Sequence, residues 1–191
     1  GQNWTKIFQG LNDRERNTLS LTQDPADQKA FYLGTEGGLF QSRDSGKTWQ
    51  KDTNGFARKR VPSLLADPEN NQLFIASEEG LSRIMIQTKR FDRIYQTKGG
   101  IDLDISSLET EETEETDSET KTDLDQVHSL VLASRPSTFI AMGTARGVFV
   151  SEDEGNHWER LSLSGLKDTD ILDLAYSSKQ NRLFAATGTG I

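Results

Sequence analysis

The sequence predicts an all-β fold made of repeated four-stranded sheets, and three observations support this prediction. Residues 34–50 and 143–159 are near copies that align without a gap. Short apolar runs recur upstream of each glycine-rich segment, and turn-forming residues separate these runs. We find no long segment with the apolar periodicity of an amphipathic helix. Self-similarity at a fixed period is the signature of a repeat architecture.

Both copies contain the pattern Ser-x-Asp-x-Gly-x-x-Trp directly after an apolar run. Short Ser and Asp side chains bond to nearby backbone N–H groups, and Gly takes the positive φ of a tight hairpin. The indole can bury a large ring between sheets, and its N–H needs one acceptor. We interpret the Asp as part of a structural hairpin, against the alternative of a catalytic or calcium-binding carboxylate, because its lone pairs are used within the turn. The pattern residues are Ser42, Asp44, Gly46, Trp49 and Ser151, Asp153, Gly155, Trp158.

The repeat continues along the chain with a period of about 43 residues, the size of one propeller blade of four short strands. Trp4 and Phe91 hold the tryptophan position of further units, whereas Ile84, Ile86 and Thr88 replace the Ser, Asp and Gly of the second. We therefore predict one β-propeller segment over residues 1–191. Its units cover about residues 10–54, 55–97, 126–163 and 168–191, with a strand like 1–9 completing the last.

The two ends of the chain supply complementary parts of a unit. Ile191 aligns with Val148, and Gly1 aligns with Gly155. We expect the strand from Trp4 to Phe8 to pair as the outermost strand of the last unit, within one chain or with another polypeptide. We also expect the chain to be a segment of a longer propeller.

The Ser-x-Asp-x-Gly-x-x-Trp pattern resembles the Asp-box, or bacterial neuraminidase repeat. This repeat is found in the β-propellers of sialidases, sortilin-type receptors, xyloglucanase-like glycosidases and plant-type photosystem II assembly factors. The resemblance implies a β-propeller, or an arc of one, in which the box is a structural hairpin near the rim and away from the ligand face. It also implies a secreted, periplasmic or luminal protein. The two boxes do not indicate which of these families the chain resembles most.

Acidic charge is concentrated in one segment of the chain. Of the 30 Asp and Glu residues, 11 lie in residues 101–125, which contain a single Lys. This segment has the composition of a disordered insertion between two units. It is either a tolerated loop expansion, which we favour, or an acidic tether for a basic partner or cations. The rest of the chain is nearly neutral, which argues against nucleic-acid binding.

Few residues point to a cofactor, a metal or an active site. The chain has no Cys, and we find neither a signal peptide nor a membrane span. His128 and His157 are far apart in sequence, so we expect no metal pair. A glycosidase needs two carboxylates across a cleft, and Asp173, in an apolar inner strand, is the least ordinary acid of the chain. The alternative is that Asp173 is an ordinary strand-edge residue that faces solvent. We expect no cofactor and assign no catalytic residue.

One basic cluster precedes an inner strand and is suited to phosphate or an acidic protein, against the alternative of solvated loop charge. It consists of Arg58, Lys59 and Arg60. We predict a non-catalytic scaffold or a module that binds a protein or glycan. The alternative is part of a secreted glycoside hydrolase, xyloglucanase-like or sialidase-like, whose catalytic acids lie outside this segment.

Overall fold

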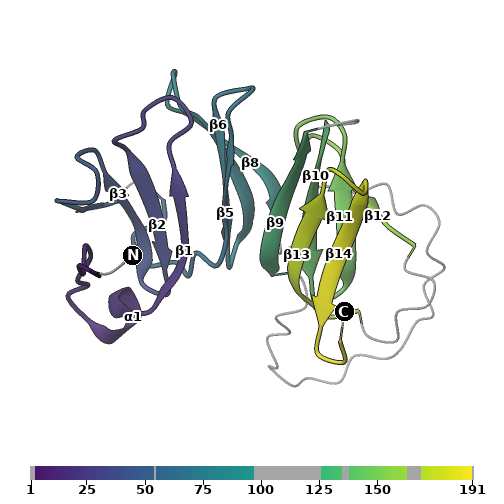
Figure 1. Ribbon diagram of the computed structural model, residues 1–191, viewed down its shortest axis with the longest axis horizontal. Coiled ribbons are helices and arrows are strands. Elements are labelled where there is room, and N and C mark those ends of the chain that lie inside the picture. The colour runs from purple at the N-terminus through teal and green to yellow at the C-terminus, as the bar shows by residue number, and fades with distance from the viewer. Residues whose placement is uncertain (1–2, 54, 97–125, 135–137, 163–168, 191) are drawn as a thin grey trace.

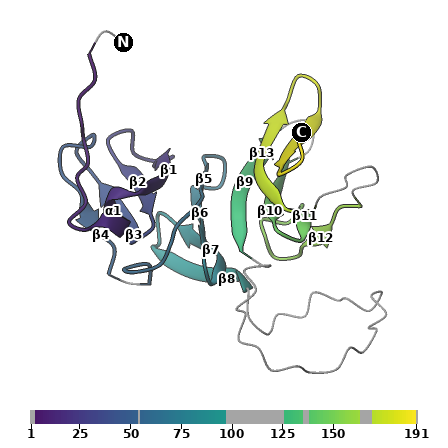
Figure 2. The same cartoon turned by 90° about the horizontal axis from the view of Figure 1, so that it is seen from below.

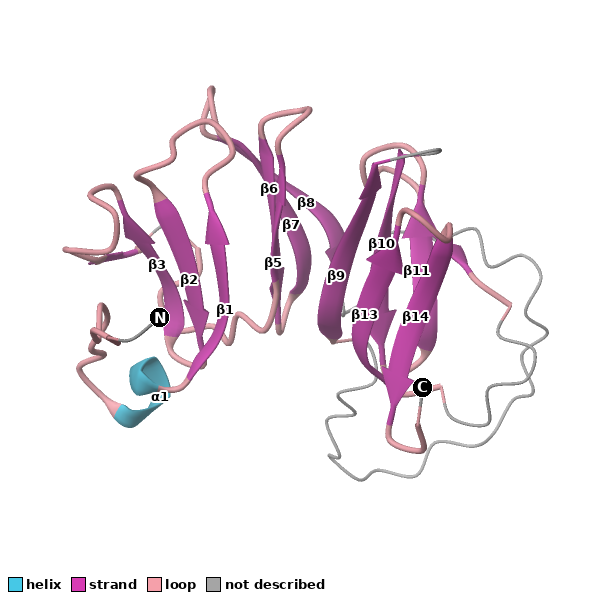
Figure 3. Cartoon of the chain, viewed as in Figure 1, coloured by secondary structure: helices cyan, strands magenta, loops and turns pink. Residues whose placement is uncertain are grey.

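The computed structural model describes residues 3–53, 55–96, 126–134, 138–162 and 169–190. Within these residues the secondary structure is almost entirely β, and the one helix is the short α1 (Asp13–Arg16), as Figure 3 shows. The strands form three four-stranded sheets and one two-stranded sheet. The all-β prediction is confirmed.

Each sheet is an antiparallel meander, and we number the sheets as blades 1 to 4. Blade 1 contains β1 (Thr18–Gln23), β2 (Phe31–Thr35), β3 (Gly38–Ser42) and β4 (Gln50–Lys51). Blade 2 contains β5 (Leu64–Asp67), β6 (Gln72–Ser77), β7 (Gly80–Met85) and β8 (Arg90–Gln96). Blade 3 contains β9 (Val127–Ser134), β10 (Thr138–Thr144), β11 (Gly147–Ser151) and β12 (Glu159–Arg160). Blade 4 contains β13 (Ile171–Ser177) and β14 (Arg182–Thr187).

The blades stand side by side along an arc (Figure 1). Seen from below, the first strand of each blade lies on the inner side of the arc, and the last strand of blades 1 to 3 lies on the outer side (Figure 2). The inner strands contact one another in succession, β1 with β5, β5 with β9 and β9 with β13. Neighbouring blades therefore pack face to face.

The middle strands of the blades are apolar on both faces because a blade lies on each side. In β6, Leu73 and Ile75 pack toward blade 1, whereas Phe74 and Ala76 pack toward blade 3. Successive side chains of a strand point to opposite faces, so a continuous apolar run serves two interfaces at once. This is why the sequence shows apolar runs here instead of strict alternation.

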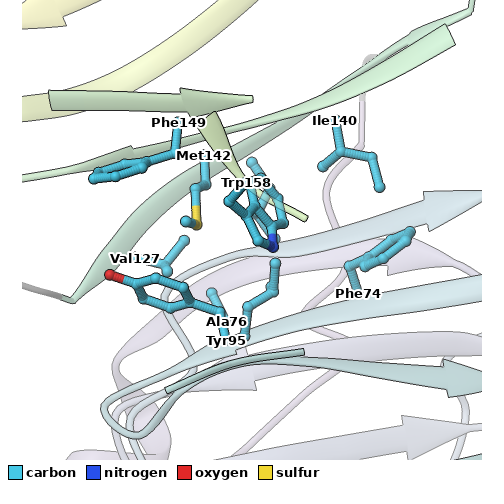
Figure 4. Close-up of a cluster of buried hydrophobic side chains, with 10 residues drawn as sticks. Phe74, Ala76, Tyr95, Val127, Ile140, Met142, Phe149 and Trp158 are labelled. Carbon is cyan, nitrogen blue, oxygen red and sulfur yellow. The ribbon is translucent and has the colours of Figure 1, made fainter. Parts of the chain in front are cut away.

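Among the described residues, three apolar clusters lie between neighbouring blades. In the cluster between blades 2 and 3, Trp158 and Met142 point toward Ala76 and Tyr95 (Figure 4). Its other buried members are Phe74, Leu81, Val127, Leu130, Ile140 and Phe149. The cluster between blades 1 and 2 contains Tyr32, Leu39, Phe56, Val61, Leu73 and Ile75, and that between blades 3 and 4 contains Ala141, Val148, Ile171 and Leu174.

The two box tryptophans are not equally buried, although their equivalence in the repeat predicts that they should be. Trp158 is 7% exposed because blade 2 covers it, whereas Trp49 is only half-buried. The structure describes no blade in front of blade 1, and Phe8 packs edge-on against Trp49 there with ring centroids 5.7 Å apart. The equal burial predicted for Trp49 is therefore wrong, because its burial depends on a neighbouring blade.

The N-terminal segment lies against blade 1 and not beside blade 4. Residues 3–10 form no strand, and among the described strands β13 and β14 pair only with each other as a sheet. The predicted strand from Trp4 to Phe8 is therefore not formed within the described chain. The segment sits at the opposite end of the arc from blade 4, so it cannot reach β14 in this arrangement (Figure 2).

Helix α1 fixes the point where the N-terminal segment enters blade 1. The side chain of Asn12 accepts a hydrogen bond from the Glu15 N–H at 3.0 Å, as an N-cap does. Glu15 is 3% exposed and forms an ion pair with Lys51 of β4 at 2.6 Å. The pairing lowers the pKa of Glu15, since the hydrogen bond from Lys51 outweighs the cost of burial.

Blade 2 keeps its hairpin without the box residues. Ile84 and Ile86 pack against the cluster between blades 1 and 2, and Lys89 supplies the positive φ of the turn at 53°. The predicted acidic insertion, residues 101–125, lies outside the described residues. None of the helices in the described part of the chain is long and apolar enough to cross a membrane.

Candidate functional site

The blades have two different ends, and the residues singled out from the sequence lie at both. The box end carries the turns between β3 and β4 and between β11 and β12, which contain the two Ser-x-Asp-x-Gly-x-x-Trp boxes. The connection end carries the turns between the second and third strands, together with the chain that links one blade to the next. The basic cluster and the start of each inner strand lie at the connection end.

At the box end, the first box forms a closed hydrogen-bond network. Ser42 Oγ donates to Asp44 Oδ1 at 2.9 Å and accepts from the Gly46 N–H at 2.9 Å. Asp44 accepts from the Thr48 N–H at 2.8 Å and from its hydroxyl at 2.7 Å. The indole N–H of Trp49 donates to the Gly46 carbonyl oxygen at 3.1 Å. These bonds join the Ser, Asp, Gly and Trp of the pattern within one turn.

The second box repeats the network with one change of partner. Ser151 Oγ donates to Asp153 Oδ1 at 2.8 Å and accepts from the Gly155 N–H at 2.8 Å. The His157 N–H donates to Asp153 at 2.8 Å, and its imidazole contacts the other carboxylate oxygen, where the first box has the Thr48 hydroxyl. Gly46 and Gly155 have φ of 82° and 89°, as the tight turn requires.

The turn networks hold both box carboxylates in the ionised form. Hydrogen bonds from the Thr48 backbone and hydroxyl lower the pKa of Asp44 to about 2. Burial raises the pKa of Asp153, but hydrogen bonds from His157 and Ser151 outweigh it and bring the value to about 2. A general acid near neutral pH needs the opposite shift. The geometry therefore suits a turn-forming role.

At the connection end, the basic cluster is only partly neutralised. Lys59 forms an ion pair with Glu79 of the β6–β7 turn at 2.7 Å, and Arg93 reaches the same carboxylate at 3.1 Å. Lys59 also lies over the Phe56 ring, 5.8 Å from its centroid. These contacts attach the loop that follows blade 1 to blade 2.

The two arginines that flank Lys59 differ from it in their charged contacts. Arg58 is exposed and Arg60 is half-buried. Within the described residues, neither guanidinium makes an ion pair or a side-chain hydrogen bond, whereas Lys59, Arg83, Arg90 and Arg93 all do. A guanidinium presents a fork of donors that matches a carboxylate or phosphate. The loop thus offers two cationic groups to a ligand.

The inner strands of blades 3 and 4 meet through a polar cluster that the sequence indicated only in part. Ser129 Oγ donates to Asp173 Oδ1 at 2.7 Å, and the Leu174 N–H donates to both side chains. His128 Nδ1 lies 3.0 Å from the Ile171 carbonyl oxygen. It also lies 3.6 Å from Asp170 Oδ1, an approach that the sequence did not predict.

The strand pairings of blades 1, 3 and 4 show that Ser129 and Asp173 stand at equivalent positions of the repeat. Ser20 pairs with Gly34, Ser129 with Gly143 and Asp173 with Ala186, so the three polar residues occupy one position of the repeat. At this position Ser20 donates to the Val61 carbonyl oxygen of the next blade at 3.2 Å. A polar side chain at this position therefore bonds its own blade to the next one. Asp173 is one of the two partners in such a bond. Among the described residues, we find no group of three acidic or His side chains arranged for a metal ion.

Comparison with known proteins identifies the fold. No protein-family model and no curated protein sequence matches the chain. The extracellular domain of BT4673 from B. thetaiotaomicron matches with a TM-score of 0.62 at 15% identity, covering 91% of this chain and 21% of that one. The Niastella koreensis GH74 enzyme matches with a TM-score of 0.60 at 16% identity, covering 93% and 27%. YCF48 from Cyanidioschyzon merolae matches with a TM-score of 0.59 at 14% identity, covering 93% and 52%.

The fold is that of a β-propeller. The chain resembles GH74 enzymes and YCF48 in this respect, and it forms an arc of blades. It spans 21% of the BT4673 domain, 27% of the GH74 enzyme and 52% of YCF48. At these identities the likeness concerns the fold alone, so the function rests on the residues of this chain.

Proposed function

We propose that the chain is a non-catalytic binding module of a larger Asp-box propeller, and that the connection end is its ligand face. The observation that carries this proposal is the pair of guanidiniums, Arg58 and Arg60, that have no charged partner within the described residues. Repeat folds present ligands with a surface built from the loops between strands. The ion pair of Lys59 with Glu79 attaches this loop to blade 2, so the two arginines are held next to that blade.

We propose that the ligand is an anionic segment of a protein or glycan. Two arginines separated by one residue favour carboxylate or phosphate groups, because each guanidinium can donate two parallel hydrogen bonds to one such group. We assign the two boxes a structural role at the opposite end. Their carboxylates are already engaged by Thr48 and His157, which supports this assignment.

A binding measurement with a synthetic acidic peptide tests the proposal. Titration of the chain into a fluorescent poly-glutamate peptide, followed by anisotropy, should give saturable binding that weakens as the salt concentration rises. The double variant Arg58→Ala/Arg60→Ala should bind at least tenfold more weakly. Arg182→Ala, an exposed arginine at the box end of blade 4, is the matched control and should bind like the parent. Equal loss in both variants, or no binding by the parent, would contradict the proposal.

A glycoside hydrolase is the second candidate, and Asp173 is the observation that favours it. Asp173 is exposed at the inner edge of the arc, and Asp170 lies close to it in sequence. One of the similar structures is a xyloglucanase from Xanthomonas campestris. Incubation of the chain with xyloglucan and measurement of reducing sugar separates the candidates. Release that Asp173→Asn abolishes would favour the enzyme, whereas no release, together with salt-sensitive binding of the acidic peptide, would favour the module.

We also propose that the protein works outside the cytoplasm, in a secreted, periplasmic or luminal location. The extracellular domain among the similar structures supports this proposal. Cell fractionation with an antibody against the chain tests it, and recovery in the cytoplasmic fraction alone would contradict it.

A further inference from the structure

A groove of about 260 Å³ lies at the box end, between blades 2 and 3. The β5–β6 turn of blade 2 forms one wall, and the second box turn of blade 3 forms the other. Apolar residues at the end of β9 and the start of β10 complete the lining. The residues that matter here are Glu69, Leu132, Phe139, Ile140, Glu152 and Glu154.

The second box leaves this groove open because it folds back on itself. Gly80 of blade 2 and Gly147 of blade 3 open equivalent hairpins, so Ile86 stands where Asp153 does. Ile86 packs against the cluster between blades 1 and 2. Asp153 instead accepts hydrogen bonds within its own turn. The box therefore leaves space beside blade 2 that an apolar side chain takes up beside blade 1.

The groove is acidic, and part of its charge has no counter-ion. Arg83 Nη1 donates to the Glu154 carbonyl oxygen at 2.9 Å and lies 4.0 Å from its carboxylate. Glu69 and Glu152, which we call the rim carboxylates, are exposed, and neither forms an ion pair within the described residues. No described Lys, Arg or His lines the groove. The described acids are not arranged for a metal ion, so the groove favours an organic cation.

A buried amide beside the groove lacks one of its hydrogen bonds. Gln72 of β6 is 1% exposed, and its Nε2 donates to Glu154 Oε2 at 2.8 Å. Within the described residues, Gln72 Oε1 accepts no hydrogen bond. Because both atoms belong to one amide, Oε1 lies next to the carboxylate that lines the groove. A buried carbonyl oxygen without a donor is unfavourable, so a ligand N–H that reaches Glu154 gains a second acceptor here.

We propose that this groove binds an arginine side chain of a partner protein. A guanidinium carries its N–H donors in a planar fork, so it can bond to a rim carboxylate and to Gln72 Oε1 together. Its aliphatic stem packs on the apolar lining. Drug-sized ligands need pockets of about 300–1,000 Å³, so the smaller groove suits a single side chain. The site lies at the opposite end from Arg58 and Arg60 and takes a ligand of opposite charge, so it is separate from the proposed ligand face.

Heteronuclear NMR spectra of the isotopically labelled 191-residue chain, titrated with N-acetyl-arginine amide, test the proposal. The backbone signals of Glu69 and Glu152 and the side-chain amide signal of Gln72 should shift and then saturate. N-acetyl-citrulline amide has nearly the same shape but no charge, and it should cause no such shifts. Equal shifts with the two compounds, or shifts only outside the groove, would overturn the proposal.

Two double variants of equal charge separate the groove from a general attraction to acidic residues. Glu69→Gln/Glu152→Gln removes both rim carboxylates and should weaken binding of the arginine amide about fivefold, since each exposed ion pair contributes modestly. Glu109→Gln/Glu111→Gln removes the same charge from the acidic segment and should bind like the parent. Unchanged signals away from the groove confirm that each variant is folded. An equal loss in both variants would contradict a site in the groove.

Discussion

The indole nitrogen of Trp49 donates a hydrogen bond to the carbonyl oxygen of Ile7 at 2.8 Å, in addition to the one that it makes with Gly46 in its own turn. This bond joins the first box to the N-terminal segment, more than forty residues away in the sequence. Within the part of the chain that the structure describes, the indole nitrogen of Trp158 makes only the turn bond to Gly155, at 3.0 Å. The same residue of the repeat thus makes different contacts according to what lies in front of its blade.

Replacement of the two tryptophans should have unequal effects on stability. Trp158→Ala should lower the free energy of unfolding by about 3–5 kcal/mol, the range for a large core aromatic. Trp49→Ala should lower it by less, because the ring is only half-buried. Urea denaturation of both variants measures the difference. An equal loss would show that solvent does not reach Trp49 in solution.

Removal of the box serine should weaken the turn without a change in packing. Ser151→Ala leaves the Gly155 N–H without its acceptor and removes a donor to Asp153. We expect a loss of about 1–3 kcal/mol, because Ser151 is buried and its partners lose hydrogen bonds. Glu152→Ala, at the exposed next position of the same turn, serves as the control and should change stability little. A loss of equal size in both variants would contradict the network.

The box carboxylates and Glu15 should make stability fall in acid. The pKa of Asp44 and of Asp153 is lowered from 3.8 to about 2, and that of Glu15 is lowered from 4.5. A carboxyl whose pKa is lower in the folded state contributes stability above its unfolded pKa, and this contribution is lost as the pH falls through the folded value. Stability should therefore decline between about pH 5 and pH 2.

Denaturant titrations at a series of pH values measure this decline. In the double variant Asp44→Asn/Asp153→Asn, the free energy of unfolding should depend less steeply on pH below about pH 4, since two of the titrating groups are gone. Asp13→Asn, at an exposed acid of α1, is the control and should keep the parent slope. If the free energy of unfolding of the double variant depended on pH as that of the parent does, the turn hydrogen bonds would not favour the ionised carboxylates.

Deletion within the acidic segment should leave the blades intact. Residues 105–122 lie outside the described part of the chain, so this prediction rests on the sequence. Their removal should change the melting temperature little, because shortening a long surface loop alters its closure entropy only slowly. Calorimetry of the deletion variant measures the effect. Loss of cooperative unfolding would show that the segment contributes to folding.

The sequence by itself determined the all-β fold, the repeated four-stranded unit and the turn chemistry of the two boxes. These features depend on residues close in sequence: Ser42 and Gly46 meet within one turn, and the alternating faces of β6 follow from the period of a strand. Only the tertiary structure decided what covers each face. The half-exposure of Trp49, the place of Ile7 on blade 1 and the Ser129–Asp173 bond depend on neighbouring blades, whose positions no local pattern encodes.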